Sequence, residues 1–182
     1  MSELMTSPSK QKSNITFDFV EEQLRKKTFG ILSTTDPKGK PHSTGVLYGI
    51  SARPKFFFFI LTGRNYKKVR NIKANPHVSF VVPFPHYYLR FVPDSTVQIQ
   101  GTAEIVPLDD SEAQKAFSQK RILKMMLAQS NKSDSRDYVF IKIKPSRKIF
   151  CYGLGIGMRE LRESVESGGY TVIIPEEKLV DR

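Results

Sequence analysis

The chain has 182 residues, 39% of them hydrophobic, and a formal net charge of +11, a size that suits one substantial core. Its single cysteine, Cys151, excludes an internal disulfide framework, and no segment approaches the roughly 20 apolar residues of a membrane-spanning helix. We therefore expect a cytoplasmic protein with no membrane partner, made of a disordered lead over residues 1–14 and a single domain over residues 15–182.

The first half of this domain reads as a helix followed by an antiparallel meander. Thr16 is a suitable N-cap for a helix with acids in its first turns and Arg25, Lys26 and Lys27 at its end. Strand patterns follow at FGILSTT (29–35), HSTGVLYGI (42–50) and FFFFILT (56–62), separated by the turn sequences DPKGKP and SARPK. These short connections indicate neighbouring strands that run antiparallel.

The second half adds strands at 77–84, 96–107 and 137–153 and one amphipathic helix over 109–129. Gly101 stands in the middle of an alternating strand, where a glycine predicts a bulge or a close approach by another element. Six antiparallel strands with few helices predict a mainly β fold, a small barrel with helices on its outside.

The segment LTGRNYKKVRNIKANP, residues 61–76, carries five cations on one short predicted helix that ends before Pro76. Arg64, Lys67 and Lys68 crowd its start, where unpaired N–H groups and the helix dipole are already electropositive. Because cations are repelled there, the pattern favours a bound anion, most simply a phosphate. A run of Lys and Arg is also typical of a solvated face, and the residues alone leave the two interpretations about even.

The remaining reactive residue types indicate no catalytic or metal site. His42, His77 and His86 are separated along the chain and have no carboxylate pair at a spacing typical of metal sites. Cys151 is more typical of a small buried apolar side chain than of a nucleophile. Catalytic residues stay unknown at this stage, and an enzyme built from this chain would depend on a cofactor for its chemistry.

The order of the elements resembles the pyridoxamine 5'-phosphate oxidase-like FMN-binding split barrel superfamily. The resemblance covers Phe17 to Gly153 and is most specific in the pattern Thr-x(5)-Lys-x(2)-Asn-x(3)-Asn-Pro, which runs from Thr62 to Pro76. It implies a six-stranded antiparallel split β-barrel that forms homodimers and holds FMN in two equivalent clefts between the subunits.

The resemblance also implies which residues bind the cofactor. Lys67 and Lys68 fall where the family holds the FMN phosphate, and residues 44–47 fall on the strand that lies along the flavin ring. The full predicted set is Thr44, Gly45, Val46, Leu47, Thr62, Arg64, Tyr66, Lys67 and Lys68. Two positions depart from the oxidases proper, because Thr44 stands in place of an arginine and Tyr66 in place of a serine. The C-terminal tail also lacks their Arg-x-His ending.

Three classes of function follow from these observations. The first is an FMN-dependent oxidoreductase or flavin reductase with NAD(P)H as a candidate reductant, or its variant with a deazaflavin coenzyme, whose acidic tail suits the +11 charge. The second is a non-enzymatic module that binds flavin or haem. Nucleic-acid binding comes last, because the cations are spread along the chain without a recognised motif.

An apolar loop with Phe84, Tyr87, Tyr88 and Phe91 is expected to cover the flavin ring.

Overall fold

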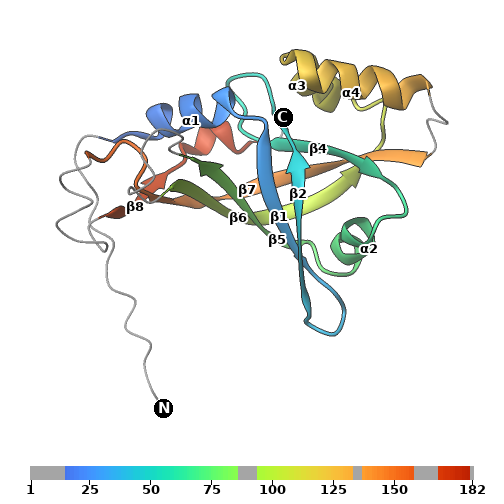
Figure 1. Cartoon of the computed structure of the whole chain (residues 1–182), viewed down its shortest axis with the longest axis horizontal. Helices are drawn as coiled ribbons and strands as arrows, with labels where there is room; N and C mark the ends of the chain where they lie inside the picture. Colours follow the sequence, from blue (N-terminus) through green and yellow to red (C-terminus); the bar gives the residue numbers. More distant parts are fainter. Residues whose placement is uncertain (1–14, 86–93, 133–136, 158–167, 181–182) are drawn as a thin grey trace.

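A curled antiparallel sheet forms the centre of the computed structural model, with helices along its outside (Figure 1). The structure describes residues 15–85, 94–132, 137–157 and 168–180. The expected lead over residues 1–14 and the aromatic residues Tyr87, Tyr88 and Phe91 lie outside the described residues. Phe84 is buried in the core at the end of a strand.

The strands confirm a mainly β, antiparallel barrel type, but the described part of the chain forms eight of them rather than six. They are β1 (Phe29–Thr35), β2 (Pro41–Leu47), β3 (Gly49–Ile50), β4 (Phe58–Gly63), β5 (His77–Phe84), β6 (Ser95–Val106), β7 (Tyr138–Tyr152) and β8 (Gly169–Ile173). Their order is β2-β1-β5-β6-β7-β4-β3, and β8 pairs with β7.

Two segments account for the higher strand count. The predicted strand 42–50 is interrupted at Tyr48, whose backbone N–H donates to the Thr28 carbonyl and whose hydroxyl donates to the Leu24 carbonyl, each at 2.8 Å. Beyond this point the chain leaves β1 and pairs with β4. The other addition, β8, lies in the C-terminal tail, where no strand was expected.

The described helices are α1 (Phe17–Lys26), α2 (Lys67–Ala74), α3 (Ser111–Ser118), α4 (Arg121–Lys132) and the short 3-10 helix η3 (Glu176–Lys178). The predicted cap of α1 is confirmed, since the Thr16 hydroxyl accepts from the Phe19 N–H at 3.4 Å. The single helix expected over 109–129 was wrong. The chain turns near Lys120, a charged residue at the position where the buried face of a continuous helix would need an apolar one.

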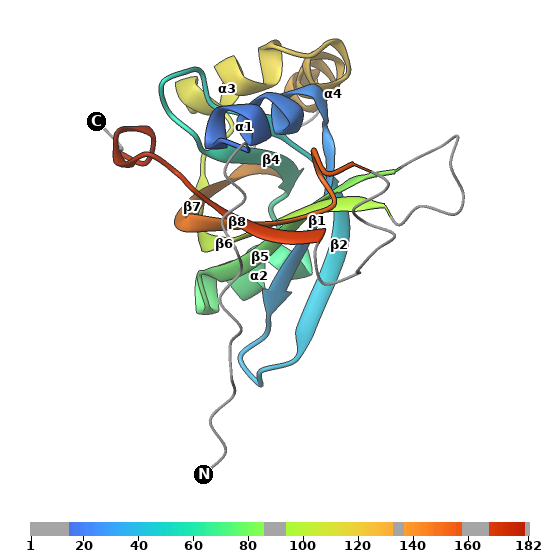
Figure 2. The same cartoon turned by 90° about the vertical axis from the view of Figure 1, so that its left-hand side faces the viewer.

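The apolar run at residues 56–60 shows how the layers are built. Phe56, Phe58 and Ile60 pack inside the barrel, whereas Phe57 and Phe59 pack outside it against α3 and α4. Successive residues of a strand face opposite sides, so a strand covered on both sides is apolar throughout. In both views α1, α3 and α4 lie above the sheet, and α2 lies below β4 and β7, while the hairpin of β1 and β2 extends further down (Figure 2).

The bulge and the close approach by another element that were predicted at Gly101 are both confirmed. The pairing of β6 with β7 shifts between Ile99 and Gly101, which marks a bulge. A Cβ atom at Gly101 would also collide with the carbonyl oxygen of Lys144, so only glycine fits there without a shift of the backbone. None of the helices in the described ranges is long and apolar enough to cross a membrane.

Candidate functional site

The sheet is open where β2 and β4 separate. β3 pairs with β4 through Gly49 with Phe59 and Ile50 with Phe58. Continuing that register would place Leu47 opposite Leu61, Val46 opposite Thr62 and Gly45 opposite Gly63. Instead β2 pairs with β1 along its whole length, and β4 pairs with β7. The residues that a closed barrel would pair therefore border a split in its wall.

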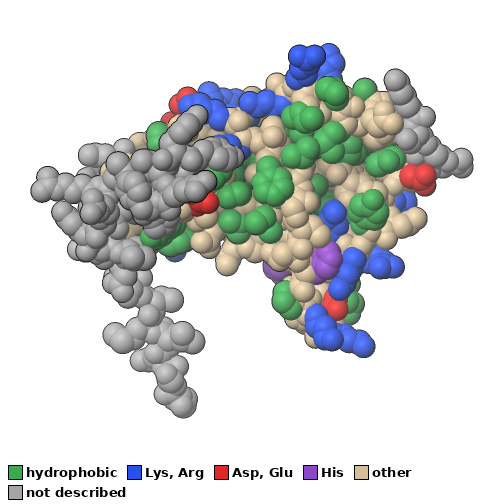
Figure 3. Space-filling model, viewed as in Figure 1, with side chains coloured by type: hydrophobic (Ala, Val, Ile, Leu, Met, Phe, Trp, Pro, Cys, Tyr) green, Lys and Arg blue, Asp and Glu red, His purple; other side chains and the backbone are tan. Residues whose placement is uncertain are grey.

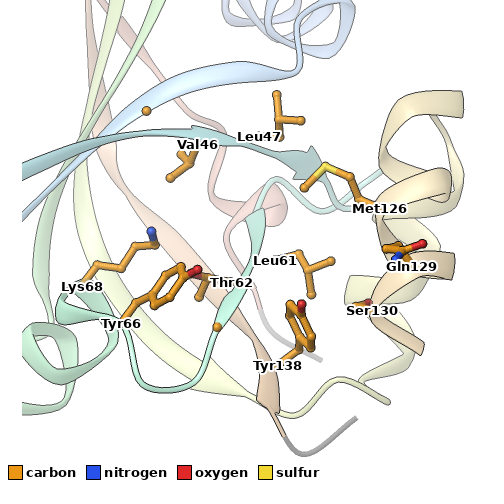
Figure 4. Close-up of a pocket in the computed structure, with 12 residues that line it drawn as sticks. Val46, Leu47, Leu61, Thr62, Tyr66, Lys68, Met126, Gln129, Ser130 and Tyr138 are labelled. Carbon is orange, nitrogen blue, oxygen red and sulfur yellow. The ribbon is translucent and has the colours of Figure 1, made fainter. Parts of the chain in front are cut away.

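A pocket of about 440 Å³ occupies this split. Its walls come from β2, β4, the start of α2, α4 and the start of β7. The lining residues are Gly45, Val46, Leu47, Leu61, Thr62, Gly63, Tyr66, Lys68, Met126, Gln129, Ser130 and Tyr138. Figure 4 shows Lys68, Tyr66 and Thr62 toward one end and the α4 residues toward the other, with Val46 above the first group. The pocket thus has one polar, cationic end and a mainly apolar middle.

The cationic end is formed by the beginning of α2. This helix has no acidic residue in its first turn, and its N-cap residue, Tyr66, makes no side-chain capping bond. Lys68 is half-buried, and burial lowers the pKa of its ammonium group. No ion pair joins Lys68 to another described residue, although its nitrogen lies 5.1 Å from the centre of the Tyr66 ring. An anion placed here would find both a helix N-terminus and a cation.

Six of the nine residues predicted to bind the cofactor line this pocket. They are Gly45, Val46, Leu47, Thr62, Tyr66 and Lys68. The other three lie beside it. Arg64 and Lys67 are exposed near the start of α2, and Thr44 precedes Gly45 on β2. The Thr44 hydroxyl oxygen is buried and has no hydrogen-bond partner among the described residues, so a donor or acceptor there is still unused.

Sequence reasoning missed the far wall of the pocket, which Met126, Gln129, Ser130 and Tyr138 form together with Leu61. Only part of the necessary signal was in the sequence. Tyr138 begins β7 and pairs with Gly63 at the end of β4, and the connection from α4 to β7 is short. Once β7 lies beside β4, the end of α4 has to lie near the same point. That inference needed the strand order, which the sequence alone did not supply.

Among the residues that the structure describes, no histidine or cysteine lines the pocket. Cys151 is fully buried in the barrel core, as expected, and burial raises the pKa of its thiol to about 12. His77 is exposed on β5, and His42 is half-buried on β2 with an Nδ1 atom that has no partner among the described residues. His86 lies outside the described residues.

Comparison with known proteins agrees with this architecture. Residues 17–151 match the family model described as pyridoxamine 5'-phosphate oxidase. The chain belongs to this family. A curated relative, the pyridoxine/pyridoxamine 5'-phosphate oxidase of Coxiella burnetii (strain RSA 493 / Nine Mile phase I), is 29% identical over 125 residues. The aligned part is 66% of this chain and 58% of the relative, so the chain spans less than two thirds of the relative's length.

Solved structures share the fold at lower identity. HutZ, the heme storage protein from Vibrio cholerae, is 17% identical with a TM-score of 0.59, and the match covers 76% of this chain and 96% of HutZ. An F420 reductase is 24% identical with a TM-score of 0.50, over 69% of this chain and 92% of that chain. These similarities and the family match confirm the expected split-barrel resemblance.

Proposed function

We propose that this chain is an FMN-dependent oxidoreductase or flavin reductase that holds FMN in the pocket between β2 and β4, at the interface of a homodimer. The observation that carries the proposal is the position of Lys68. Its half-buried ammonium group has no ion pair with a described residue and lies at the start of a helix without an acidic first turn. A phosphate there would compensate for the burial of this cation.

The rest of the pocket suits the other parts of FMN. Val46, Leu47 and Leu61 offer apolar surface for a flat ring, as ligand pockets commonly do. Thr62 and the buried Thr44 hydroxyl place polar groups at or next to the cationic end. When bound, the flavin ring would supply the electron-transfer chemistry. The residues of the chain bind the ring, orient it and exclude water from it.

The surface around the pocket supports the homodimer. Phe29 and Ile31 are exposed on β1, opposite the pocket residues Leu47 and Gly45 in the β1–β2 register. Met125, on α4 next to the pocket residue Met126, is 60% exposed. Figure 3 shows hydrophobic side chains gathered in the middle of this face. A second copy of the chain laid over this surface would bury it and close the pocket.

The proposed activity is tested by anaerobic reduction. Protein reconstituted with FMN and desalted should lose its yellow absorbance when NADH or NADPH is added, at a rate above that of free FMN. A bound flavin that stays yellow with both nucleotides would argue instead for storage or sensing.

A second candidate is a reductase that uses a deazaflavin coenzyme. The observation in its favour is the outer face of α2, where Lys67, Arg70 and Lys73 are exposed at intervals of three residues. Such a face would attract the acidic tail of that coenzyme, and the F420 reductase compared above shares the fold. Reconstitution with each coenzyme separately distinguishes the two candidates, because only the preferred one should survive desalting.

Haem binding has less support from the pocket. HutZ is described as a heme storage protein, but none of the twelve residues that line the pocket of this chain is a histidine or a cysteine, two of the commonest haem ligands. The haem-ligand types that do line it are Tyr66, Tyr138 and Met126. Titration with hemin tests this candidate, because a saturable band that FMN displaces would favour it and a signal that never saturates would argue against it.

A further inference from the structure

The ring of Tyr66 lies close both to the backbone of Gly63 and to the ammonium group of Lys68. A Cβ atom added at Gly63 would lie 3.2 Å from Cε1 of Tyr66 and 3.4 Å from Cδ1 and Cζ. The ring therefore packs directly on the turn that joins β4 to α2. Nζ of Lys68 lies over the same ring, 5.1 Å from its centre. This is within the distance of about 6 Å at which a cation is attracted by the face of an aromatic ring.

Tyr66 lies outside the two apolar core clusters of the described residues. Its side chain is 59% exposed, so it adds little to the core. It also occupies the N-cap of α2 without making a capping bond, although Ser, Thr, Asp and Asn are preferred at that position because they make one. The resemblance to the oxidases places a serine here. Tyr66 therefore lacks the capping bond that the position favours and instead contacts the ammonium group of Lys68. Such departures from local preference are expected at functional sites.

The attraction between the Tyr66 ring and the ammonium group of Lys68 offsets part of the cost of burying that group. This ammonium group is half-buried and has no ion pair with a described residue. A lysine side chain has several rotatable bonds, and ordering them on binding costs free energy. A ring that already holds the ammonium group reduces that cost.

We propose that Tyr66 is a positioning residue, whose ring holds the ammonium group of Lys68 at the cationic end of the pocket before an anionic ligand arrives. Where the anion is the phosphate of FMN, the inference rests on the function proposed above. The consequence is a pocket that prefers FMN over riboflavin more strongly than the charge of a freely moving lysine would allow.

The first test needs no ligand. The ring current of Tyr66 should move the NMR signals of the Lys68 ε-methylene group upfield in the wild-type protein, with the signals assigned by their loss in Lys68→Gln. Tyr66→Phe keeps a ring and should keep the shift. Tyr66→Ala and Tyr66→Ser should return the signals to the values of an exposed lysine. Signals that are the same in wild type and Tyr66→Ala would overturn the inference.

The second test measures selectivity for phosphate, as the ratio of the dissociation constants of riboflavin and FMN. This ratio should fall about twofold to tenfold in Tyr66→Ala and Tyr66→Ser, the range set by the cost of ordering one long side chain on binding. It should be kept in Tyr66→Phe. In a Lys68→Ala background, Tyr66→Ala should lower it no further. Tyr138→Ala is the matched control, since it removes an aromatic ring from the other end of the pocket and should leave the ratio unchanged.

The outcomes separate the two proposals. If Tyr66→Ala weakens the binding of both ligands equally, the ring is only a wall of the pocket and the inference is overturned. If the wild-type protein binds no FMN, the proposed function fails, and the ligand-free NMR comparison still decides whether Tyr66 positions Lys68.

Discussion

The side-chain amide of Asn71 donates a hydrogen bond of 3.0 Å to the hydroxyl oxygen of Thr34. Both side chains are buried, and the Thr34 hydroxyl in turn donates to the carbonyl oxygen of His42 at 3.3 Å. The chain of bonds connects α2, β1 and β2. Because Lys68 is on α2 and Val46 is on β2, this connection fixes the cationic end of the pocket relative to its apolar wall.

Replacing Asn71 by Ala should destabilise the protein and weaken FMN binding together. A buried hydroxyl left without its donor costs about 1 to 3 kcal/mol, and α2 loses its side-chain hydrogen bond to β1. Urea unfolding and FMN titration measure the two effects. Asn75→Ala is the matched control at the C-cap of α2, where the Asn75 side chain accepts a hydrogen bond from the His77 N–H at an exposed position. Equal stability and equal FMN affinity in Asn71→Ala and wild type would contradict this role.

Lys67 and Lys68 should contribute unequally to FMN binding. Lys68 lines the pocket and is half-buried, whereas Lys67 is exposed. Losing one charge-assisted bond of about 1.5 to 3 kcal/mol should weaken FMN binding roughly tenfold to a hundredfold in Lys68→Ala. Lys67→Ala should change it far less, and riboflavin should bind both variants like wild type. Fluorescence titration gives the dissociation constants of FMN and riboflavin. A larger loss of FMN affinity in Lys67→Ala than in Lys68→Ala would show that the phosphate binds outside the pocket.

A larger side chain at Leu61 should block the pocket without unfolding the barrel. Leu61 is half-buried on β4, and a tryptophan there would extend into the pocket. FMN and riboflavin should both bind at least tenfold more weakly to Leu61→Trp, a loss of about 1.4 kcal/mol or more. Ile173→Trp is the control, because Ile173 is exposed on β8 and does not line the pocket. Wild-type flavin affinity in Leu61→Trp would show that the ligand binds elsewhere.

The carboxylate of Glu21 should make stability depend on pH. Glu21 is fully buried; burial alone would raise its pKa, but bonds from Lys178 at 2.6 Å, Arg25 at 2.8 Å and Arg53 at 3.2 Å outweigh this and lower it. A lowered pKa in the folded state means that the carboxylate stabilises the protein above its ordinary pKa of 4.5 and loses this effect as the pH falls through the folded value.

The comparison of wild type with Glu21→Gln isolates this effect. The difference in unfolding free energy should be constant above about pH 5 and should shrink on further acidification. Glu22→Gln is the control, because Glu22 pairs with Lys26 at an exposed position and should give almost no difference. A Glu21→Gln difference that grows as the pH falls would have the wrong sign for this account.

The sequence predicted the parts of the fold that depend on local pattern. The alternation of β6, the cap of α1 and the bulge at Gly101 could each be read from a few neighbouring residues. The split itself could not be predicted in this way. It depends on Tyr48, which is held by hydrogen bonds to Thr28 and Leu24 at the point where pairing with β1 ends and pairing with β4 begins.

The candidate site was predictable to a similar degree. The crowding of cations on α2 was visible, and a finer signal was present within it. Val69 and Ile72 are the buried apolar residues of that helix, and Lys68 lies four residues before Ile72, so it shares that face, whereas Lys67 does not. The α4 wall could not be predicted in this way, because Met126 reaches the pocket only through the packing of α4 beside the sheet.

The most direct test of the central claim is the absorption spectrum of the protein after incubation with excess FMN and removal of free ligand by desalting. The account predicts a yellow protein that retains stoichiometric FMN and sediments as a dimer, and loss of the colour when Leu61→Trp is treated in the same way. A wild-type protein that is colourless after this treatment would contradict the proposal that the pocket between β2 and β4 is an FMN site.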